Sequence, residues 1–543
     1  MGLRLRAWPV RYNSWGACIL GFAACMALWA WQKHEGFAVV ALVFLVFSLV
    51  GLRDVLQTHH AILRNYPVIG HMRFFLEYVR PELRQYFIEG DTEAAPFSRA
   101  QRSLVYQRAK MAPDNRPFGT QMDVATDGYE WINHSMFPTT LASSDFRITI
   151  GETSKQPYSA SIFNISAMSF GSLSANAIMA LNKGAKLGNF AHDTGEGSIS
   201  QYHREHGGDL IWEIGSGYFG CRDDKGRFSE ERFVANATSP QVKMIEIKLS
   251  QGAKPGHGGI LPGAKVTPEI SLARGVPIGV DCVSPSSHSA FTTPMEMMAF
   301  ITKLRDLSGG KPVGFKFCVG HPWEWFGIVK AMLKSGVTPD FIVIDGAEGG
   351  TGAAPVEFID HVGAPLQEGL LLVHNTLVGT GLRDRIRLGC AGKVISAFDI
   401  ARMMALGADW CNAARGYMMA LGCIQAQVCH SGDCPTGVTT QDPVRQRALV
   451  VPDKGLRVYN FHQATLHALK ELVQAAGLNH PQEIGSHHIV RRINFNEVRL
   501  LSNLLTQVEP GSLLSGDMSN QHNVFKMYWP MAQPDAFTAA LVH

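Results

Sequence analysis

Charge is scarce in this chain. Asp, Glu, Lys and Arg make up 17% of its 543 residues, and the formal net charge is only +3. A nucleic-acid-binding domain usually carries a strong basic excess, so we expect no nucleic-acid partner. Cysteine is also scarce, with 10 residues, which argues against a disulfide framework. Half of the cysteines are scattered and suit small buried hydrophobes: Cys221, Cys282, Cys318, Cys390 and Cys411.

The remaining cysteines include one close group. Cys423, Cys429 and Cys434 follow the spacing C-x5-C-x4-C, and Pro435 comes directly after the last of them. Thiolates at such short spacing, followed by a proline, suit an iron–sulfur cluster. Three ligands instead of four predict a three-iron cluster. A zinc site or a chance grouping is the alternative, but the C-x2–4-C pairs typical of zinc are absent here.

Two uncharged apolar runs lie near the start of the chain, at 15–31 and 37–52. Each is near the short limit for crossing a bilayer, so residues 1–54 are predicted to form a transmembrane helical hairpin. No small-residue cleavage site stands out, which disfavours a cleaved signal peptide. By the positive-inside rule, the flanking arginines predict a multi-pass protein of the cell membrane with a cytoplasmic catalytic domain: Arg4, Arg6, Arg11, Arg53 and Arg64. Residues 55–157 are broken by prolines and predict an irregular, α-rich linking region.

The body of the chain repeats a strand–loop–helix rhythm. Eight apolar runs, each followed by glycine-rich or polar residues, predict an α/β fold of the (β/α)8 TIM-barrel type. A doubly wound open sheet is the alternative, but it needs a glycine-rich fingerprint after the first strand, and residues 168–171 do not provide one. The predicted strands are Ile162–Met168, Phe190–Asp193, Met244–Leu249, Ile278–Val283, Val313–Val319, Phe341–Asp345, Ile386–Leu388 and Asp409–Ala414.

Residues that follow the later strands are candidates for holding a cofactor. The loops after the last two strands precede helix-like runs, where backbone N–H groups could bind a phosphate. They contain Gly392, Lys393, Arg415 and Gly416. The loop Gly349-Gly350-Thr351-Gly352 lacks a Cβ at three of four positions, so a flat flavin ring could approach its backbone closely. The alternative is that these glycines only turn the chain.

Single charged or titratable residues near the strand ends are candidates for catalysis. Lys316 lies in an otherwise apolar strand. If it points inward, it is a buried cation able to stabilise a reduced flavin or a substrate carboxylate. If it points outward, it only extends its charged end to water. His257, His288 and His321 each follow a predicted strand, so each could donate a proton, or each could be an ordinary polar group.

Over roughly residues 158–447, the chain resembles the central and FMN-binding part of glutamate synthase. The resemblance is carried by 168–174, 194–197, 254–256, 261–266, 284–285, 349–353 and the cysteine group with Pro435 to Val438. It implies that FMN is bound by the cofactor residues named above and by Met168, Ser169, Gly171, Thr194, Glu196 and Lys316. It also implies a 3Fe-4S cluster on the three cysteines, with Lys316 as a catalytic residue. His257, which follows a predicted strand, is our second candidate catalytic residue.

In that family, electrons enter through the cluster and the reduced flavin gives hydride to 2-iminoglutarate, which forms from 2-oxoglutarate and ammonia and yields glutamate. No amidotransferase domain precedes the barrel, and residues 448–543 are predicted to be an α-rich extension in place of the family's long β-helix. We therefore expect an external electron donor, such as ferredoxin or a separate NAD(P)H reductase, and ammonia from solution or a separate subunit.

Two departures from the family pattern leave the substrate open. His257 replaces the usual acid after Lys254-Pro255-Gly256, and Val343 stands where the family has a glutamine. Both lie near the expected position of the oxo acid. A dehydrogenase of a related amino or 2-hydroxy acid therefore remains an alternative, as does a membrane-tethered flavin and iron–sulfur electron relay without a substrate.

Overall fold

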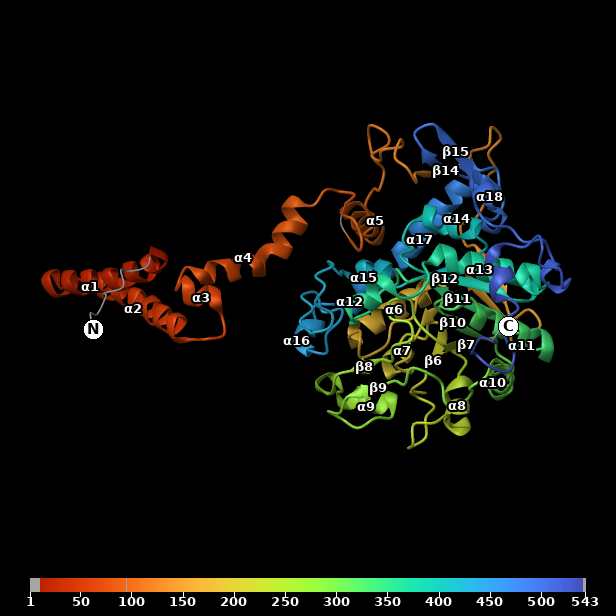
Figure 1. The fold of residues 1–543 in the computed structure, drawn as a ribbon, viewed down its shortest axis with the longest axis horizontal. Coiled ribbons are helices and arrows are strands. Elements are labelled where there is room, and N and C mark those ends of the chain that lie inside the picture. Colours follow the sequence, from red (N-terminus) through yellow and green to blue (C-terminus); the bar gives the residue numbers. More distant parts are fainter. Residues whose placement is uncertain (1–9, 94, 541–543) are drawn as a thin grey trace, which may run out of the picture. The chain divides into compact units, whose positions relative to one another are not determined.

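The computed structural model describes residues 10–93 and 95–540. Two compact units divide the chain, Met1–Ala100 and Gln101–His543 (Figure 1). Each unit has its own internal packing, and we describe each by itself.

The N-terminal unit is helical. Helices α1 (Asn13–Gln32) and α2 (Glu35–Leu56) pack against each other, and the left-handed Lys33 (φ 54°) ends the first of them. The Trp15 side chain donates to the Ser48 carbonyl at 2.9 Å, across the pair. Both helices are long and apolar enough to cross a membrane, with mean hydropathy of 1.5 and 2.4 in their most apolar stretches. The short helices that follow are α3 (Ala61–Asn65), α4 (Gly70–Leu83) and a π-helix, Arg84–Ile88.

Eight parallel strands close into a barrel in the second unit, which confirms the (β/α)8 prediction. The barrel closes because β13 pairs with β4. In order, the strands are β4 (Phe163–Ile165), β5 (His192–Asp193), β6 (Leu210–Ile214), β7 (Val242–Lys248), β10 (Val313–Phe317), β11 (Phe341–Asp345), β12 (Arg387–Ala391) and β13 (Trp410–Ala413). Every residue of β6 and of β10 is buried, as expected for parallel strands covered on both sides.

One of the eight predicted strands was wrong. Only Cys282–Val283 of the run Ile278–Val283 forms a strand, β9, and it pairs antiparallel with β8 (Ile260–Leu261) outside the barrel. Ile278 and Val280 are 60% and 54% exposed. The barrel takes β6 instead, which sequence reasoning missed because Glu213 interrupts its apolar run.

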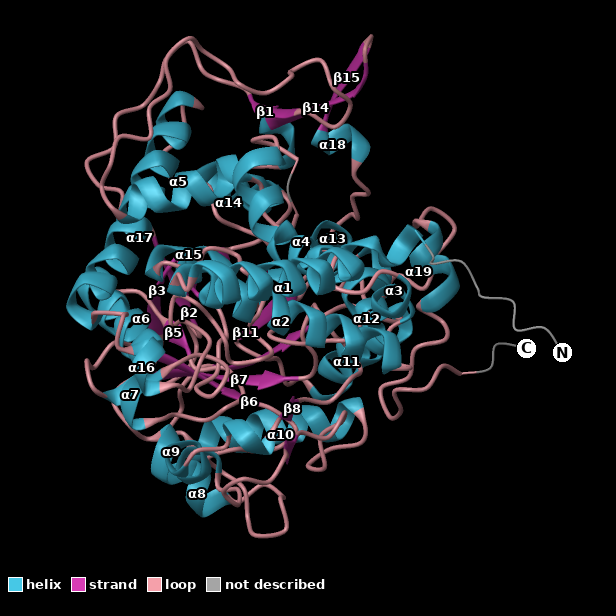
Figure 2. Cartoon of the chain, turned by 90° about the vertical axis from the view of Figure 1, so that its left-hand side faces the viewer, coloured by secondary structure: helices cyan, strands magenta, loops and turns pink. Residues whose placement is uncertain are grey.

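Helices surround the barrel strands, which are magenta in Figure 2. They are α6 (Ala175–Gly188), α7 (Gln201–Arg204), α8 (Glu230–Ala237), α10 (Pro294–Leu307), α11 (Pro322–Ser335), α13 (Leu366–Gly379), α14 (Ala397–Ala405) and α15 (Arg415–Leu421). Side-chain caps fix several starts: Ser174 caps α6, and Thr293 forms a capping box with Glu296 on α10.

Further elements cover the barrel. Helix α17 (Val451–Ala475) packs along α6, α14 and α15, and so holds the C-terminal segment on the body. Strands β1 (Glu130–Ile132), β14 (Ile489–Asn494) and β15 (Glu497–Leu500) form a small antiparallel sheet, and β2 (Arg147–Ile150) pairs with β3 (Tyr158–Ser161). The remaining helices are α5 (Arg99–Ala109), α9 (Pro268–Arg274), α12 (Val356–His361), α16 (Pro443–Gln446), α18 (Leu501–Leu504) and α19 (Asn523–Tyr528).

Candidate active site

The residues predicted to bind a cofactor lie at the carboxyl end of the barrel. Because all eight strands are parallel, the loops that follow them meet at this end. Met168, Ser169 and Gly171 follow β4; Thr194 and Glu196 follow β5; Lys316 lies in β10; Gly349, Gly350, Thr351 and Gly352 follow β11; Gly392 and Lys393 follow β12; Arg415 and Gly416 follow β13.

Close backbone approaches join the loops after β4 and β5. A Cβ on Gly195 would lie 2.7 Å from the Ser169 backbone nitrogen, and Gly195 itself has a left-handed φ of 64°. A Cβ on Gly197 would lie 2.7 Å from the Ser169 Cβ. Neither position can hold a larger residue without moving the neighbouring loop. Thr194 is turned toward the barrel wall, where its hydroxyl accepts a hydrogen bond from the Glu213 backbone N–H at 3.1 Å.

The loops after β11 and β13 are joined by Arg415. Its guanidinium donates to the Glu348 carbonyl at 2.6 Å, and a Cβ on Gly350 would lie 2.8 Å from Arg415 Nε. A Cβ on Gly352 would meet nothing within 4 Å, so the loop surface is open there. The structure thus brings the glycine loop and one of the predicted phosphate-binding cations together.

Gly392 and Lys393 line a cavity of about 360 Å³ together with Glu348 and with residues of the helices α13 and α14, among them Arg402. Lys393 has a left-handed φ of 54°, and burial lowers the pKa of its ammonium. The carboxylate of Asp399 already accepts from the backbone N–H groups of Ile395 and Ser396, ahead of α14. An anion at this end of the cavity would therefore meet the Lys393 side chain more readily than the helix start.

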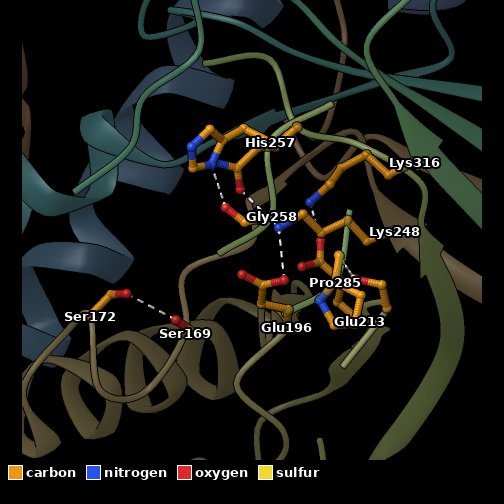
Figure 3. A network of polar contacts seen from close by, with 12 residues as sticks. Ser169, Ser172, Glu196, Glu213, Lys248, His257, Gly258, Pro285 and Lys316 are labelled. Atoms are coloured by element: carbon orange, nitrogen blue, oxygen red, sulfur yellow. Dashed lines mark hydrogen bonds and ion pairs between the residues drawn. The ribbon is translucent and has the colours of Figure 1, made fainter. Parts of the chain in front are cut away.

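Lys316 points into the barrel, which settles the choice between its two predicted orientations. Its side chain is 4% exposed, and its ammonium forms an ion pair with Glu213 of β6. A second carboxylate, Glu246 of β7, lies 3.5 Å from the same nitrogen. In Figure 3 the side chains of Lys316 and Glu213 point toward one another. Burial alone would lower the pKa of Lys316, but Glu213, Glu246 and Asp193 together raise it well above its usual range.

Sequence reasoning missed the acids around Lys316. Asp193, Glu213 and Glu246 each place one carboxylate oxygen within 4.8 Å of the others, and all three are buried. Burial, together with the charge of Glu213, raises the pKa of Asp193 to about 7, and burial and Asp193 raise the pKa of Glu246 well above its ordinary value. Charged residues inside the short apolar runs of β6 and β7 were the available signal.

A second ion pair lies beside this cluster. Glu196, after β5, pairs with Lys248 at the end of β7 at 3.1 Å, and Lys248 also donates to Gln251 at 2.9 Å. Figure 3 shows Glu196 and Lys248 pointing toward one another. Burial would raise the pKa of Glu196, but the Lys248 charge and hydrogen bond lower it overall. Glu196 is thus a paired, ionised carboxylate at the strand ends.

The three candidate histidines differ in their surroundings. His257 is exposed beside Gly258, whose carbonyl lies 2.7 Å from its Nδ1 (Figure 3). Its ring packs edge-on against Phe358. His288 is buried, with Nε2 2.9 Å from the Lys248 carbonyl and Nδ1 3.0 Å from the Tyr218 hydroxyl. Burial lowers the pKa of His288 to about 4, which fits a neutral structural group. His321 stacks on Trp323.

The cysteine group occupies the tightly curled loop that follows α15. Gln425 and Gln427 both have left-handed φ values near 60°, and the Gln425 N–H donates to Cys423 Sγ at 3.4 Å. Burial would raise the pKa of Cys434, but hydrogen bonds from Thr436 and Thr439 lower it to about 7. Lys265 donates to the Cys429 carbonyl at 3.2 Å. Burial raises the pKa of Cys423 to about 11. Three thiols on one loop are the donor type of an iron–sulfur cluster, although the groups of described residues whose ligand atoms lie within 4.8 Å of one another do not include them.

Comparison with known proteins gives the family. The model of the conserved region in glutamate synthase matches residues 131–479. The chain is 39% identical over 511 residues to the glutamate synthase large subunit-like protein YerD of Bacillus subtilis, covering 86% of this chain and 97% of that protein.

More distant relatives match a smaller part. The chain is 35% identical over 336 residues to an archaeal-type glutamate synthase (NADPH) of Thermotoga neapolitana, covering 62% of this chain and 63% of that protein. It is also 35% identical over 338 residues to an archaeal glutamate synthase (NADPH) of Methanocaldococcus jannaschii, with the same coverage. It therefore spans less than two thirds of these two proteins. The match to the conserved region and to YerD shows that the chain belongs to the glutamate synthase family.

Proposed function

We propose that the protein is an FMN- and iron–sulfur-dependent oxidoreductase that converts 2-oxoglutarate and ammonia, through 2-iminoglutarate, into glutamate. Family membership supports the reaction type, and one observation supports the site: a buried Lys316 ammonium held among carboxylates at the carboxyl end of the barrel. A bound FMN would supply the hydride, and a 3Fe-4S cluster would deliver electrons from outside.

The residues at the strand ends fit FMN. Ser169 and Gly171 belong to a loop that is packed tightly against Gly195 and Gly197, so the backbone is bare of side chains where a flat ring would lie. Lys393 and Arg415 follow β12 and β13, and they would hold the phosphate. Lys316 is the buried cation that would stabilise negative charge beside the ring or on the substrate.

The cysteine loop fits the cluster by its donor set. Replacing Cys429 with Ser should remove iron and leave most of the FMN bound, because the loops that fit FMN belong to the barrel. The matched control is Cys282→Ser, a buried cysteine of β9 outside this loop. Iron and FMN per chain are measured for each variant. Unchanged iron in the Cys429→Ser protein would refute the ligand assignment.

The N-terminal helix pair would anchor the protein in the cell membrane, with both ends and the barrel in the cytoplasm. The large apolar side chains that α2 exposes support this, because water does not favour them: Val39, Val40, Leu42, Val43, Val46, Phe47, Leu49 and Leu52. A variant lacking residues 1–54 should remain in the soluble fraction after membranes are sedimented, and it should keep its flavin colour. A variant that aggregates without colour would assign the segment to the folding core.

A separate partner would supply electrons, as ferredoxin or an NAD(P)H reductase does, and ammonia would come from solution or from another subunit. The cysteine loop is the proposed entry point. Cys423 and Cys429 are only partly buried, which supports this, because a cluster on them would lie near the protein surface.

Oxidation of a related amino or 2-hydroxy acid is the second candidate function. The observation that favours it is the exposed imidazole of His257, since an imidazole is a group that can accept a proton from a hydroxyl group. Val343, in contrast, is a buried residue of β11 paired in register with Lys316, so it has no polar group to offer a substrate.

The test uses the full-length protein, purified without oxygen in detergent. We expect a flavin spectrum that dithionite bleaches, and we expect 2-oxoglutarate plus ammonia to restore the oxidised spectrum with formation of glutamate. Restoration that needs a different oxo acid, or bleaching by a 2-hydroxy acid, would favour the second function. A colourless, metal-free protein would overturn both.

A further inference from the structure

Three carboxyl groups share one buried space with a single cation. Asp193, Glu213 and Glu246 extend from the neighbouring strands β5, β6 and β7, and Lys316 reaches them from β10. The exposure of the three residues is between 0% and 2%. If all three were ionised, the group would carry a net charge of −2 in the barrel interior. An uncompensated buried charge is very unfavourable, so the cluster must retain at least one proton at neutral pH.

Hydrogen bonding shows where that proton belongs. Glu213 is already matched, because it forms the close ion pair with Lys316. In contrast, neither carboxyl oxygen of Glu246 has a hydrogen-bond donor among the described residues, and Oδ2 of Asp193 lacks one too. A buried ionised carboxylate without donors pays the full desolvation penalty. One proton shared between Asp193 and Glu246 gives each group a partner, because a protonated carboxyl group donates to an ionised one.

The other groups that face the cluster agree with this assignment. Asp345, at the end of β11, accepts from the Gly252 N–H at 2.9 Å, and burial raises the pKa of its carboxyl group as well. The neighbourhood therefore contains four acids around Lys316, and the charge of Lys248 also acts on Asp345. A metal ion would be a poor alternative occupant, because the Lys316 ammonium already contacts Glu213 and lies 3.5 Å from Glu246.

We propose that Asp193 and Glu246 form an internal proton store, and that Glu246 returns a proton to Lys316 after Lys316 has given one to the substrate. This use of the store rests on the proposed function. Lys316 Nζ–H donates a proton to the substrate nitrogen and becomes a neutral amine. Glu246 Oε1–H then gives its proton to Nζ across the 3.5 Å gap, which restores the ammonium and leaves a carboxylate. No electrons move in this step, and solvent later refills the store.

Glu246 is thus a positioning and proton-holding residue, and it does not need to touch the substrate. Its distance to Nζ is longer than a hydrogen bond but short enough to close by a small side-chain movement. Glu213 contacts the same ammonium in the closer of the two ion pairs. The two glutamates consequently have different tasks: Glu213 keeps Lys316 charged, and Glu246 recharges it.

Infrared difference spectroscopy of the full-length protein with its bound cofactors tests the store directly. The wild-type protein at neutral pH should show the carbonyl stretch of a buried protonated carboxyl group, and this band should shift in D2O. Glu246→Gln and Asp193→Asn should each remove the band from its wild-type frequency, because each takes away one of the two groups that share the proton, while Glu230→Gln, an exposed acid paired with Lys303, should not. Using two variants keeps the test valid if one of them folds poorly. A wild-type protein without the band, or a band that survives both substitutions, would overturn the store.

Turnover then tests the use of the store. Glu246→Gln should lower kcat by about 100-fold, the lower end of the range for a lost proton transfer, with KM little changed. The acid limb of the kcat pH profile should move as well, which a purely structural residue would not cause. If the wild-type protein shows the band but the Glu246→Gln variant turns over normally, the transfer to Lys316 is refuted. If the wild-type protein shows the band but forms no glutamate, the proton store is supported and the proposed function is rejected.

Discussion

Two lysines five residues apart lie at opposite ends of one barrel strand and behave in opposite ways. Lys311, just before β10, donates to the backbone carbonyls of Ala237 and Ser239 at 2.6 and 2.7 Å. Burial and nearby Lys243 lower its pKa to about 8. Lys316, inside β10, is equally buried, yet its acidic neighbours raise its pKa. The charge of a buried lysine is thus set by its partners: neutral carbonyls do not compensate for lost hydration, whereas carboxylates do.

Replacing Lys316 should destabilise the protein more than replacing Lys311. Lys316→Met leaves Glu213 without its counter-ion inside the barrel, and we expect the free energy of unfolding to fall by about 3–5 kcal/mol. Urea unfolding at pH 7 measures this loss. The double variant Lys316→Met, Glu213→Gln should recover much of it, since it removes both charges. A loss that the second substitution does not reduce would mean that packing, and not charge, makes Lys316 important.

The acids around Lys316 should also make the free energy of unfolding depend on pH. The pKa of Asp193 rises from 3.8 to about 7 on folding, so the folded protein holds a proton that the unfolded chain has released. The contribution of Asp193 to the free energy of unfolding should therefore be complete below about pH 4. It should decrease as the pH rises to about 7, by up to about 1.4 kcal/mol per pH unit for one proton. Urea unfolding at several pH values across this range should show that the free energy of unfolding depends less on pH in Asp193→Asn than in the wild-type protein. An identical pH dependence would place the titration elsewhere.

Replacing Lys311 should have the smallest effect. Lys311→Met removes the donor from two carbonyl groups, and we expect a loss of about 1–3 kcal/mol in the free energy of unfolding. The same urea experiment at pH 7 gives a direct comparison with Lys316→Met. A loss at Lys311 equal to that at Lys316 would contradict the distinction between neutral and charged partners.

Much of the barrel could be predicted from the sequence because buried parallel strands are short apolar runs that end in glycine or polar residues. Val313–Phe317 and Phe341–Asp345 follow this pattern closely. The exchange of Ile278–Val283 for Leu210–Ile214 shows where the pattern fails. Hydrophobicity alone cannot tell an exposed segment beside a two-residue strand from a buried one that carries an acid.

The loop residues of the candidate site could be named from the sequence, and their cofactor roles stay predictions, whereas the acids that face Lys316 across the barrel could not be named. Glycines after β11 and the cysteine spacing are local features of the sequence. Glu213 and Glu246, in contrast, acquire a role only because β6, β7 and β10 are adjacent, and that arrangement is set by tertiary pairing. Lys316 could be named in advance, but its orientation could not, because either face of a fully buried strand is apolar.

The pairing of Lys316 with acids on two other strands also favours the observed alignment of β10 in the barrel. In the observed alignment, Lys316 lies opposite Lys248 of β7 and Val343 of β11. Sliding β10 by one residue would turn the ammonium to the outer face of the barrel wall and put Phe315 or Phe317 against the carboxylates. Misaligned barrels would then hold these acids in the interior without the Lys316 cation, which is unfavourable.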